Sequence, residues 1–178
     1  AVYKEYQRRL ESNDACDFAD LILKTVAVFE ENDKVLANYQ KQYKYIMVDE
    51  YQDTNQAQYK LTHLLAKKYS NIAVVGDDAQ SVYGFRGADY RNILNFETDW
   101  PEAEVVMLEQ NYRSTQNILD AADCIISKNQ DQKDKKLWTQ KEEGPAIKVQ
   151  KVPDEKEEAR FVVSEIRDLV VEKDDEDL

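Results

Sequence analysis

Residues 46–53 read Ile-Met-Val-Asp-Glu-Tyr-Gln-Asp, and residues 74–87 read Val-Val-Gly-Asp-Asp-Ala-Gln-Ser-Val-Tyr-Gly-Phe-Arg-Gly. We expect each segment to begin as a short buried strand and to end abruptly in polar, acidic residues. In an open parallel sheet, ligands bind at the carboxyl ends of the strands. A strand that ends there in Asp49 and Glu50 can hold Mg²⁺ and position a water molecule against a phosphate. The two segments therefore indicate part of a nucleotide-driven machine.

Length and composition set limits on the class of protein. The 178 residues suffice for one domain or for parts of two. No apolar run approaches the roughly 20 residues that span a bilayer, and no signal peptide opens the chain, so we expect a cytoplasmic protein with no membrane partner. Two cysteines are too few for a disulfide framework. The net charge of −12 argues against a free-standing nucleic-acid binder, because phosphate contacts need Lys and Arg.

Hydrophobic periodicity predicts strands that alternate with helices. The expected strands are residues 45–48, 72–75, 105–108 and 146–152. The expected helices lie within residues 1–43, 55–69, 89–95 and 155–171, with one more after an N-cap at Ser114. This alternation predicts an α/β fold, a parallel sheet with flanking helices.

Asp49 and Glu50 can do different work if both reach one site. One carboxylate would bind Mg²⁺, which bridges the β- and γ-phosphate oxygens, and the other would orient the attacking water. Adjacent strand residues point to opposite faces, so the chain must leave the strand there. The alternative is a strand end with two solvated acids.

The second segment combines an amide with aromatic and basic side chains. Gln80 can sense a γ-phosphate oxygen by hydrogen bonding. Tyr83, Phe85 and Arg86 suit single-stranded nucleic acid, because bases stack on rings and Arg meets the phosphates. The alternative is that Tyr83 and Phe85 are core residues.

A third polar segment, residues 110–115, lies between an expected strand and an expected helix. Arg113 can act there as an arginine finger, which stabilises the charge of a phosphoryl group in transfer. Tyr112 can stack on a base. The alternative is an ordinary helix start with a surface arginine.

Residues 48–55, 75–89 and 108–115 resemble motifs II, III and IV of the UvrD/Rep/PcrA family, superfamily 1 DNA helicases that move 3′ to 5′ on single strands. Three motifs in this order and spacing are specific, and the resemblance covers nearly the whole chain. It implies a partial P-loop NTPase (RecA-like) helicase core that contains pieces of two cores. Residues 1–43 would end an inserted helical subdomain, residues 44–108 would form the C-terminal half of the first core, and residues 109–178 would start the second.

The resemblance also implies ATP and Mg²⁺ as cofactors, single-stranded DNA as a partner, and a role for each matching residue. Asp49 resembles the Mg²⁺-binding acid and Glu50 the residue that activates water. Gln80 resembles the glutamine that links the γ-phosphate to DNA contact. The other matches are the single-strand contacts Tyr83, Phe85 and Arg86, the adenine-packing Tyr112 and the arginine finger Arg113. Ala79 departs from the family, which commonly has Asp there, so the role of that Asp does not transfer.

The chain has no Gly-x-x-x-x-Gly-Lys-[Ser/Thr] loop, and its four glycines are Gly76, Gly84, Gly87 and Gly144. We therefore expect an internal piece of a longer helicase, inactive by itself, whose further partner is the rest of the helicase chain. The intact protein would be an ATP-dependent 3′–5′ DNA helicase or translocase in DNA repair or replication. The alternatives are a catalytically inactive module that binds nucleic acid or a partner protein, and the motor part of a helicase–nuclease.

Overall fold

The computed structural model describes residues 2–129 and 135–176. By its internal contacts the chain divides into two units, of residues 1–109 with 125–136 and of residues 110–124 with 137–178. The elements of the first unit are the helices α1 (Val2–Ser12), α2 (Phe18–Glu31), α3 (Asp33–Gln42), α4 (Gln56–Ala66), α5 (Arg91–Leu94) and α6 (Phe96–Asp99), the strands β1 (Ile46–Val48) and β2 (Ile72–Val74), and the 3₁₀ turns η1 (Tyr51–Asp53), η2 (Asp78–Gln80) and η3 (Gly84–Arg86). The second unit contains most of α7 (Gln116–Ile126) and all of α8 (Glu155–Glu176).

β1 and β2 form a two-stranded parallel sheet, with Ile46 opposite Ile72 and Val48 opposite Val74. The helix α4 connects the two strands, which gives the strand–helix–strand unit expected of an α/β fold. Backbone pairing continues past the strands, because the Val75 N–H donates to the Val48 carbonyl at 2.9 Å. The carboxyl ends of both strands therefore lie at the same edge of the sheet.

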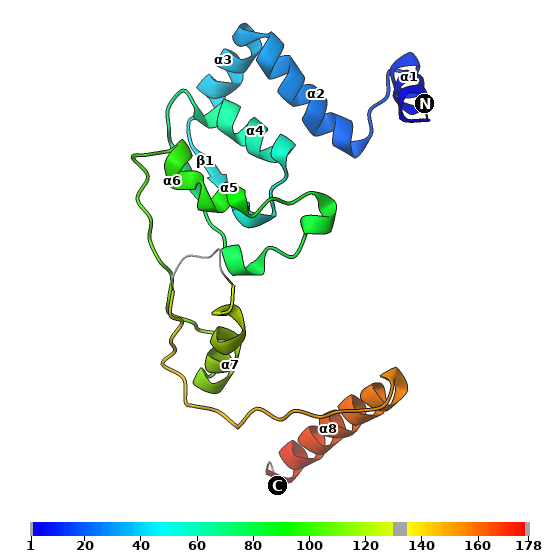
Figure 1. Cartoon of the computed structure of the whole chain (residues 1–178), viewed down its shortest axis with the longest axis vertical. Coiled ribbons are helices and arrows are strands. Elements are labelled where there is room, and N and C mark those ends of the chain that lie inside the picture. The colour runs from blue at the N-terminus through cyan, green and yellow to red at the C-terminus, as the bar shows by residue number, and fades with distance from the viewer. Residues whose placement is uncertain (1, 130–134, 177–178) are drawn as a thin grey trace. The chain divides into compact units, whose positions relative to one another are not determined.

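The helices α2, α3 and α4 pack against one another beside this sheet (Figure 1). Val26 and Phe29 on α2 and Ala66 on α4 are buried in their contact. The Phe29 ring lies 5.1 Å from that of Tyr39 on α3. The buried side chain of Gln40 donates to the Leu64 carbonyl at 2.8 Å, so its amide nitrogen is satisfied inside the cluster.

The helix α4 begins with a complete capping box. The Asn55 side chain accepts hydrogen bonds from the backbone N–H groups of Ala57 and Gln58, both at 3.0 Å. The Gln58 side-chain oxygen in turn accepts a hydrogen bond from the Asn55 N–H at 2.9 Å. These bonds satisfy amides that have no partner within a helix, and they fix the start of the helix at the expected residue.

Aromatic packing holds the segment after β2 to the rest of the first unit. Phe96 meets Tyr51 edge to face at 5.7 Å, and Trp100 lies 6.5 Å from Phe96 and 5.2 Å from His63. The buried Asn92 donates to the Thr54 carbonyl at 3.0 Å. These contacts fix α5 and α6 next to η1, at the edge where the strands end.

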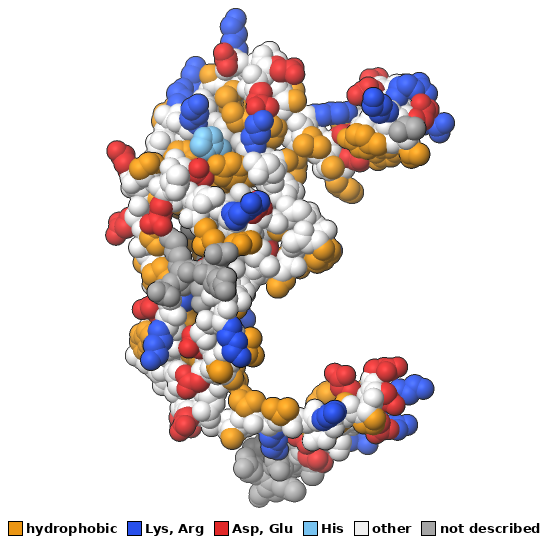
Figure 2. Space-filling model, in the orientation of Figure 1, with side chains coloured by type: hydrophobic (Ala, Val, Ile, Leu, Met, Phe, Trp, Pro, Cys, Tyr) orange, Lys and Arg blue, Asp and Glu red, His pale blue; other side chains and the backbone are white. Residues whose placement is uncertain are grey.

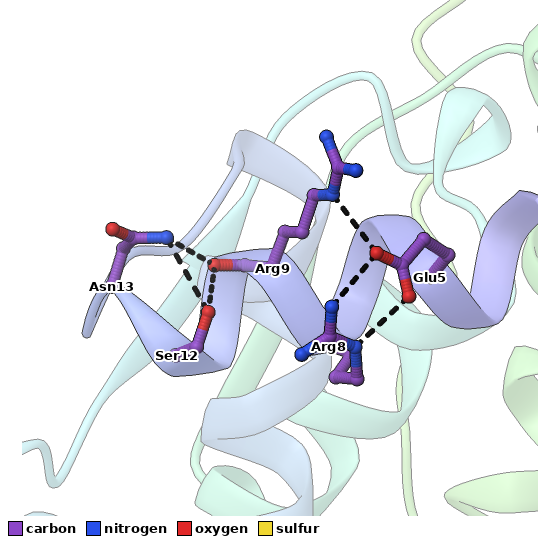
Figure 3. A network of polar contacts seen from close by, with 5 residues as sticks. All are labelled: Glu5, Arg8, Arg9, Ser12 and Asn13. Atoms are coloured by element: carbon purple, nitrogen blue, oxygen red, sulfur yellow. Dashed lines mark hydrogen bonds and ion pairs between the residues drawn. The ribbon is translucent and has the colours of Figure 1, made fainter.

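The helix α1 carries a polar network on one side, drawn in Figure 3. Glu5 accepts hydrogen bonds from Arg8 at 2.8 and 2.9 Å and from Arg9 at 2.9 Å, and Ser12 and Asn13 donate to the Arg9 carbonyl. The ion pairs are exposed and contribute little to stability. Hydrophobic side chains of α1 are exposed as well, as the orange atoms of that helix in Figure 2 show.

In the second unit, backbone and side-chain hydrogen bonds join the segment around the start of α7 to residues 138 and 144. Gln110 and Trp138 form an isolated parallel bridge, and the Asn111 N–H donates to the Trp138 carbonyl at 2.7 Å. The Asn117 side chain donates to the Gly144 carbonyl at 2.9 Å. Gly144 has a positive φ of 81°, and a Cβ there would lie 2.5 Å from the Thr115 hydroxyl oxygen, so only glycine fits.

The predictions of two of the four strands are wrong. Residues 105–108 and 146–152 form no strand in the part of the chain that the structure describes. The apolar residues Val105 to Leu108 are 40–75% exposed, with no strand beside them to accept their backbone hydrogen bonds. An apolar run forms a strand only where a partner completes the ladder.

The helix predicted over residues 155–171 is confirmed as α8, which extends to Glu176. The predicted N-cap at Ser114 is wrong, because α7 begins at Gln116 and the Asn111 side chain accepts from the Ser114 N–H instead.

None of the helices within residues 2–129 and 135–176 combines the length and apolar character that a bilayer crossing requires.

Candidate functional site

Asp49 and Glu50 follow β1 directly, and both side chains are exposed. Glu50 has the left-handed backbone conformation, with φ 50° and ψ 43°. This conformation is costly for a residue other than glycine and is common at functional sites. The strand ends there, and the Asp49 carboxylate accepts a hydrogen bond from the Glu50 N–H at 2.9 Å. Two solvent-accessible carboxylates thus lie at the carboxyl end of the first strand.

Gln52 is the most deeply buried polar side chain near this edge, at 1% exposure. Its amide nitrogen donates to the Glu50 carboxylate at 2.8 Å, and its amide oxygen accepts from the Asp77 N–H at 3.0 Å. Its backbone carbonyl accepts from the Ser81 hydroxyl at 3.3 Å. One side chain therefore connects the segment after β1 to the segment after β2. The sequence-based prediction did not single out Gln52, because it lies in a run of polar residues and nothing in that run indicates burial.

Asp77 organises the segment after β2. Its carboxylate accepts from the Gln80 side-chain amide at 2.8 Å and from the Ala79 N–H at 3.0 Å, and it forms an ion pair with Lys135. Burial alone would raise the pKa of the Asp77 carboxyl, but the Lys135 ammonium and the Gln80 amide outweigh that effect and hold the pKa below its usual value. Gln80 is thus oriented by a carboxylate that stays charged.

Tyr83, Phe85 and Arg86 lie next along the chain, at and within η3. Phe85 is 79% exposed and Tyr83 is 42% exposed, so the alternative that they are core residues is wrong. The Arg86 guanidinium lies 5.2 Å from the centre of the Tyr83 ring and 5.4 Å from that of Phe85. Gly87, with a φ of 85°, ends the turn. The result is an exposed surface of two rings and one cation, a composition that suits single-stranded nucleic acid.

Tyr112 and Arg113 belong to the second unit, just before α7. Tyr112 is 75% exposed, and its hydroxyl donates to the Gln110 side chain at 2.9 Å. The Asn111 side chain accepts from the Arg113 N–H at 2.9 Å, and Lys141 donates to the Arg113 carbonyl at 2.8 Å. The backbone of Arg113 is therefore fixed, and the residue is exposed.

Within residues 2–129 and 135–176, no group of three or more His, Cys, Asp or Glu side chains is placed to hold a metal ion. A structural metal site is therefore not found there. Mg²⁺ in nucleotide sites typically takes one or two carboxylates, with phosphates and water as its other ligands. A single exposed carboxylate such as Asp49 fits that pattern.

Comparison with known proteins identifies the class of domain and then the family. Residues 1–101 match the model of the UvrD/REP helicase N-terminal domain, and residues 106–178 match that of the UvrD-like helicase C-terminal domain. Both models describe helicase domains, and together they cover nearly the whole chain. The chain belongs to the UvrD/REP helicase family, as the resemblance of its three motifs indicates.

The relatives include proteins named ATP-dependent DNA helicase PcrA. The Staphylococcus epidermidis protein is 54% identical over 165 residues, which is 93% of this chain and 23% of that protein. The Leuconostoc citreum protein is 52% identical over 168 residues, 94% of this chain and 22% of that protein. The Staphylococcus aureus protein is 53% identical over 165 residues, with the same coverage as the first. The chain thus spans less than a quarter of the length of these relatives.

Proposed function

We propose that this chain is a section of an ATP-dependent DNA helicase that moves 3′ to 5′ along single-stranded DNA in DNA repair or replication. The observation that carries the proposal is the convergence of two segments at one sheet edge. Asp49 and Glu50 follow β1, and β2 leads through Gln80 into an exposed pair of aromatic rings. A motor needs this proximity, because ATP hydrolysis at one segment must change the affinity for DNA at the other.

The roles that we propose follow from the chemistry of each side chain. Asp49 would hold Mg²⁺, which neutralises developing phosphate charge when it is bound, and Glu50 would orient the attacking water. Gln80 would sense the γ-phosphate. The other proposed roles are adenine packing by Tyr112, an arginine finger at Arg113, and DNA contacts by Tyr83, Phe85 and Arg86.

The proposed domain limits place residues 1–43 in a helical subdomain, 44–108 in the first RecA-like core and 109–178 in the second. Because the sequence has no Gly-Lys-[Ser/Thr] phosphate loop, the rest of the helicase chain would supply it. We therefore propose that the 178 residues alone do not turn over ATP.

The test is the change Glu50→Gln in the full-length helicase. The amide keeps the size of the side chain but cannot accept a proton from water. We expect DNA-stimulated ATP hydrolysis to be abolished while the Kd for ATP is unchanged. Glu102→Gln makes the same change at an exposed position and should leave turnover intact. Normal turnover in Glu50→Gln would refute the assignment and favour a module that only binds nucleic acid or a partner protein.

A further inference from the structure

Two segments that the proposed function treats as separate parts are joined by a chain of hydrogen bonds. It runs from the Glu50 carboxylate to the Gln52 amide, from Gln52 to the Asp77 N–H, and from the Asp77 carboxylate to the Gln80 amide. Each donor–acceptor distance is between 2.8 and 3.0 Å. The first member is the proposed water-orienting acid, and the last is the proposed γ-phosphate sensor.

A glutamine side chain satisfies both ends of the central link. Its nitrogen must face Glu50, since a carboxylate accepts and does not donate, and its oxygen must face the Asp77 N–H. A glutamate at 52 would keep the bond to Asp77 but set a second carboxylate against Glu50. A methionine would leave the Asp77 N–H without this acceptor.

The surroundings of Gln52 hold the side chain in this position. It is 1% exposed, so water has little access to the side chain. Gly76 makes room for it, because a Cβ on Gly76 would lie 2.5 Å from the Gln52 amide oxygen. A buried amide that is hydrogen-bonded at both ends can transmit a displacement from one partner to the other.

We propose that Gln52 is a positioning residue that couples the water-orienting Glu50 to the loop carrying Gln80 and the exposed rings Tyr83 and Phe85. This inference rests on the proposed function. A shift of the loop on DNA binding moves the Asp77 N–H, which moves the Gln52 amide and so turns the Glu50 carboxylate toward or away from the attacking water. Gln52 touches neither ATP nor DNA in this scheme and acts through Glu50.

The test measures ATP turnover of the full-length helicase with and without single-stranded DNA. We expect Gln52→Met to lower the DNA-stimulated kcat by about 10- to 100-fold, the loss that a small misplacement of a catalytic group produces. The KM for ATP and the Kd for DNA should stay unchanged, because both ligand-binding surfaces remain. Gln52→Glu, which keeps the size and one hydrogen bond, should lose stimulation too, and it decides the question if Gln52→Met does not fold.

Gln40→Met is the matched control, because Gln40 is also a buried glutamine of the first unit that donates to a distant partner. It should lower the thermal stability by a similar amount and leave DNA stimulation intact. In a Gln80→Ala background, Gln52→Met should cause little further loss, since both residues act along one path.

Three outcomes overturn the inference. The first is full stimulation of ATP turnover by DNA in the folded Gln52 variants. The second is an equal loss of that stimulation in Gln40→Met. The third is a double variant, Gln52→Met with Gln80→Ala, whose loss of kcat equals the product of the two single losses. Glu50→Gln separates this failure from that of the proposed function. If Glu50→Gln abolishes turnover while the Gln52 variants keep full stimulation, the helicase assignment stands and only the coupling role is refuted.

Discussion

Replacement of Phe85 by alanine is expected to weaken the binding of single-stranded DNA while leaving the fold intact. The ring is 79% exposed, and its aromatic and cationic neighbours are Tyr83, with ring centres 6.0 Å apart, and the Arg86 guanidinium at 5.4 Å. A side chain in this setting supports little of the core. It is instead available to a base that stacks on it.

The magnitudes separate the two effects. Substitutions at exposed positions usually change stability by no more than about 0.5 kcal/mol. Loss of the contact with Arg86 at this exposed site lowers the stability by about 0.5–1 kcal/mol more. Loss of one base stack costs about 1–3 kcal/mol of binding free energy. Since each 1.4 kcal/mol is roughly a factor of ten, the Kd should rise by about 5- to 150-fold.

The assay is a fluorescence anisotropy titration of a labelled oligothymidine with the full-length helicase, at one fixed salt concentration because phosphate contacts depend on salt. Phe18→Ala is the matched control, since Phe18 is 91% exposed at the start of α2, a helix with no proposed DNA contact. Its Kd should equal that of the unmodified protein. An unchanged Kd for Phe85→Ala, or an equal loss for Phe18→Ala, would refute the reasoning.

Three further predictions concern stability. Gly76→Ala should cost about 1–3 kcal/mol in urea unfolding, the usual cost of overpacking, and an unchanged midpoint would contradict the crowding around Gln52. Asn55→Ala should cost about 0.5–2 kcal/mol through loss of the capping box. Asn32→Ala should cost less, because the Asn32 side chain makes no cap hydrogen bond to α3, and equal losses would count against the cap. Burial raises the pKa of Tyr51 to about 12 from its usual 10, so its neutral form contributes stability that is complete below pH 10 and is lost as the pH rises toward 12. The Tm of the unmodified protein should fall in that pH range, and the Tm of Tyr51→Phe should fall less. An equal fall of the Tm in both proteins would exclude Tyr51 as the cause.

The sequence predicted the strand–helix–strand unit well because its signals are local. Ile46–Val48 and Ile72–Val74 are short apolar runs bounded by polar residues, and Asn55 with Gln58 marks the start of α4. The predicted strand at 105–108 failed for a non-local reason. Its apolar pattern is suitable, but a strand also needs a neighbour in space.

The candidate site was predictable to a similar degree. The sequence pointed to Asp49, Glu50 and Gln80 as members of one site, and the hydrogen bonds through Gln52 connect the last two; their roles remain predictions. Gln52 and Lys135 were missed because the local sequence does not reveal the burial of Gln52 or the ion pair of Lys135 with the distant Asp77. Lys135 is 58 residues from its partner Asp77.

The exposed run from Val105 to Leu108 has a practical consequence for anyone who purifies these residues alone. Four consecutive apolar side chains, with backbone groups that no strand covers, are a template for pairing with another copy. The net charge of −12 keeps copies apart at low ionic strength, and added salt screens that repulsion. Dilute, low-salt buffers should therefore favour a monodisperse sample, and added salt should favour precipitation.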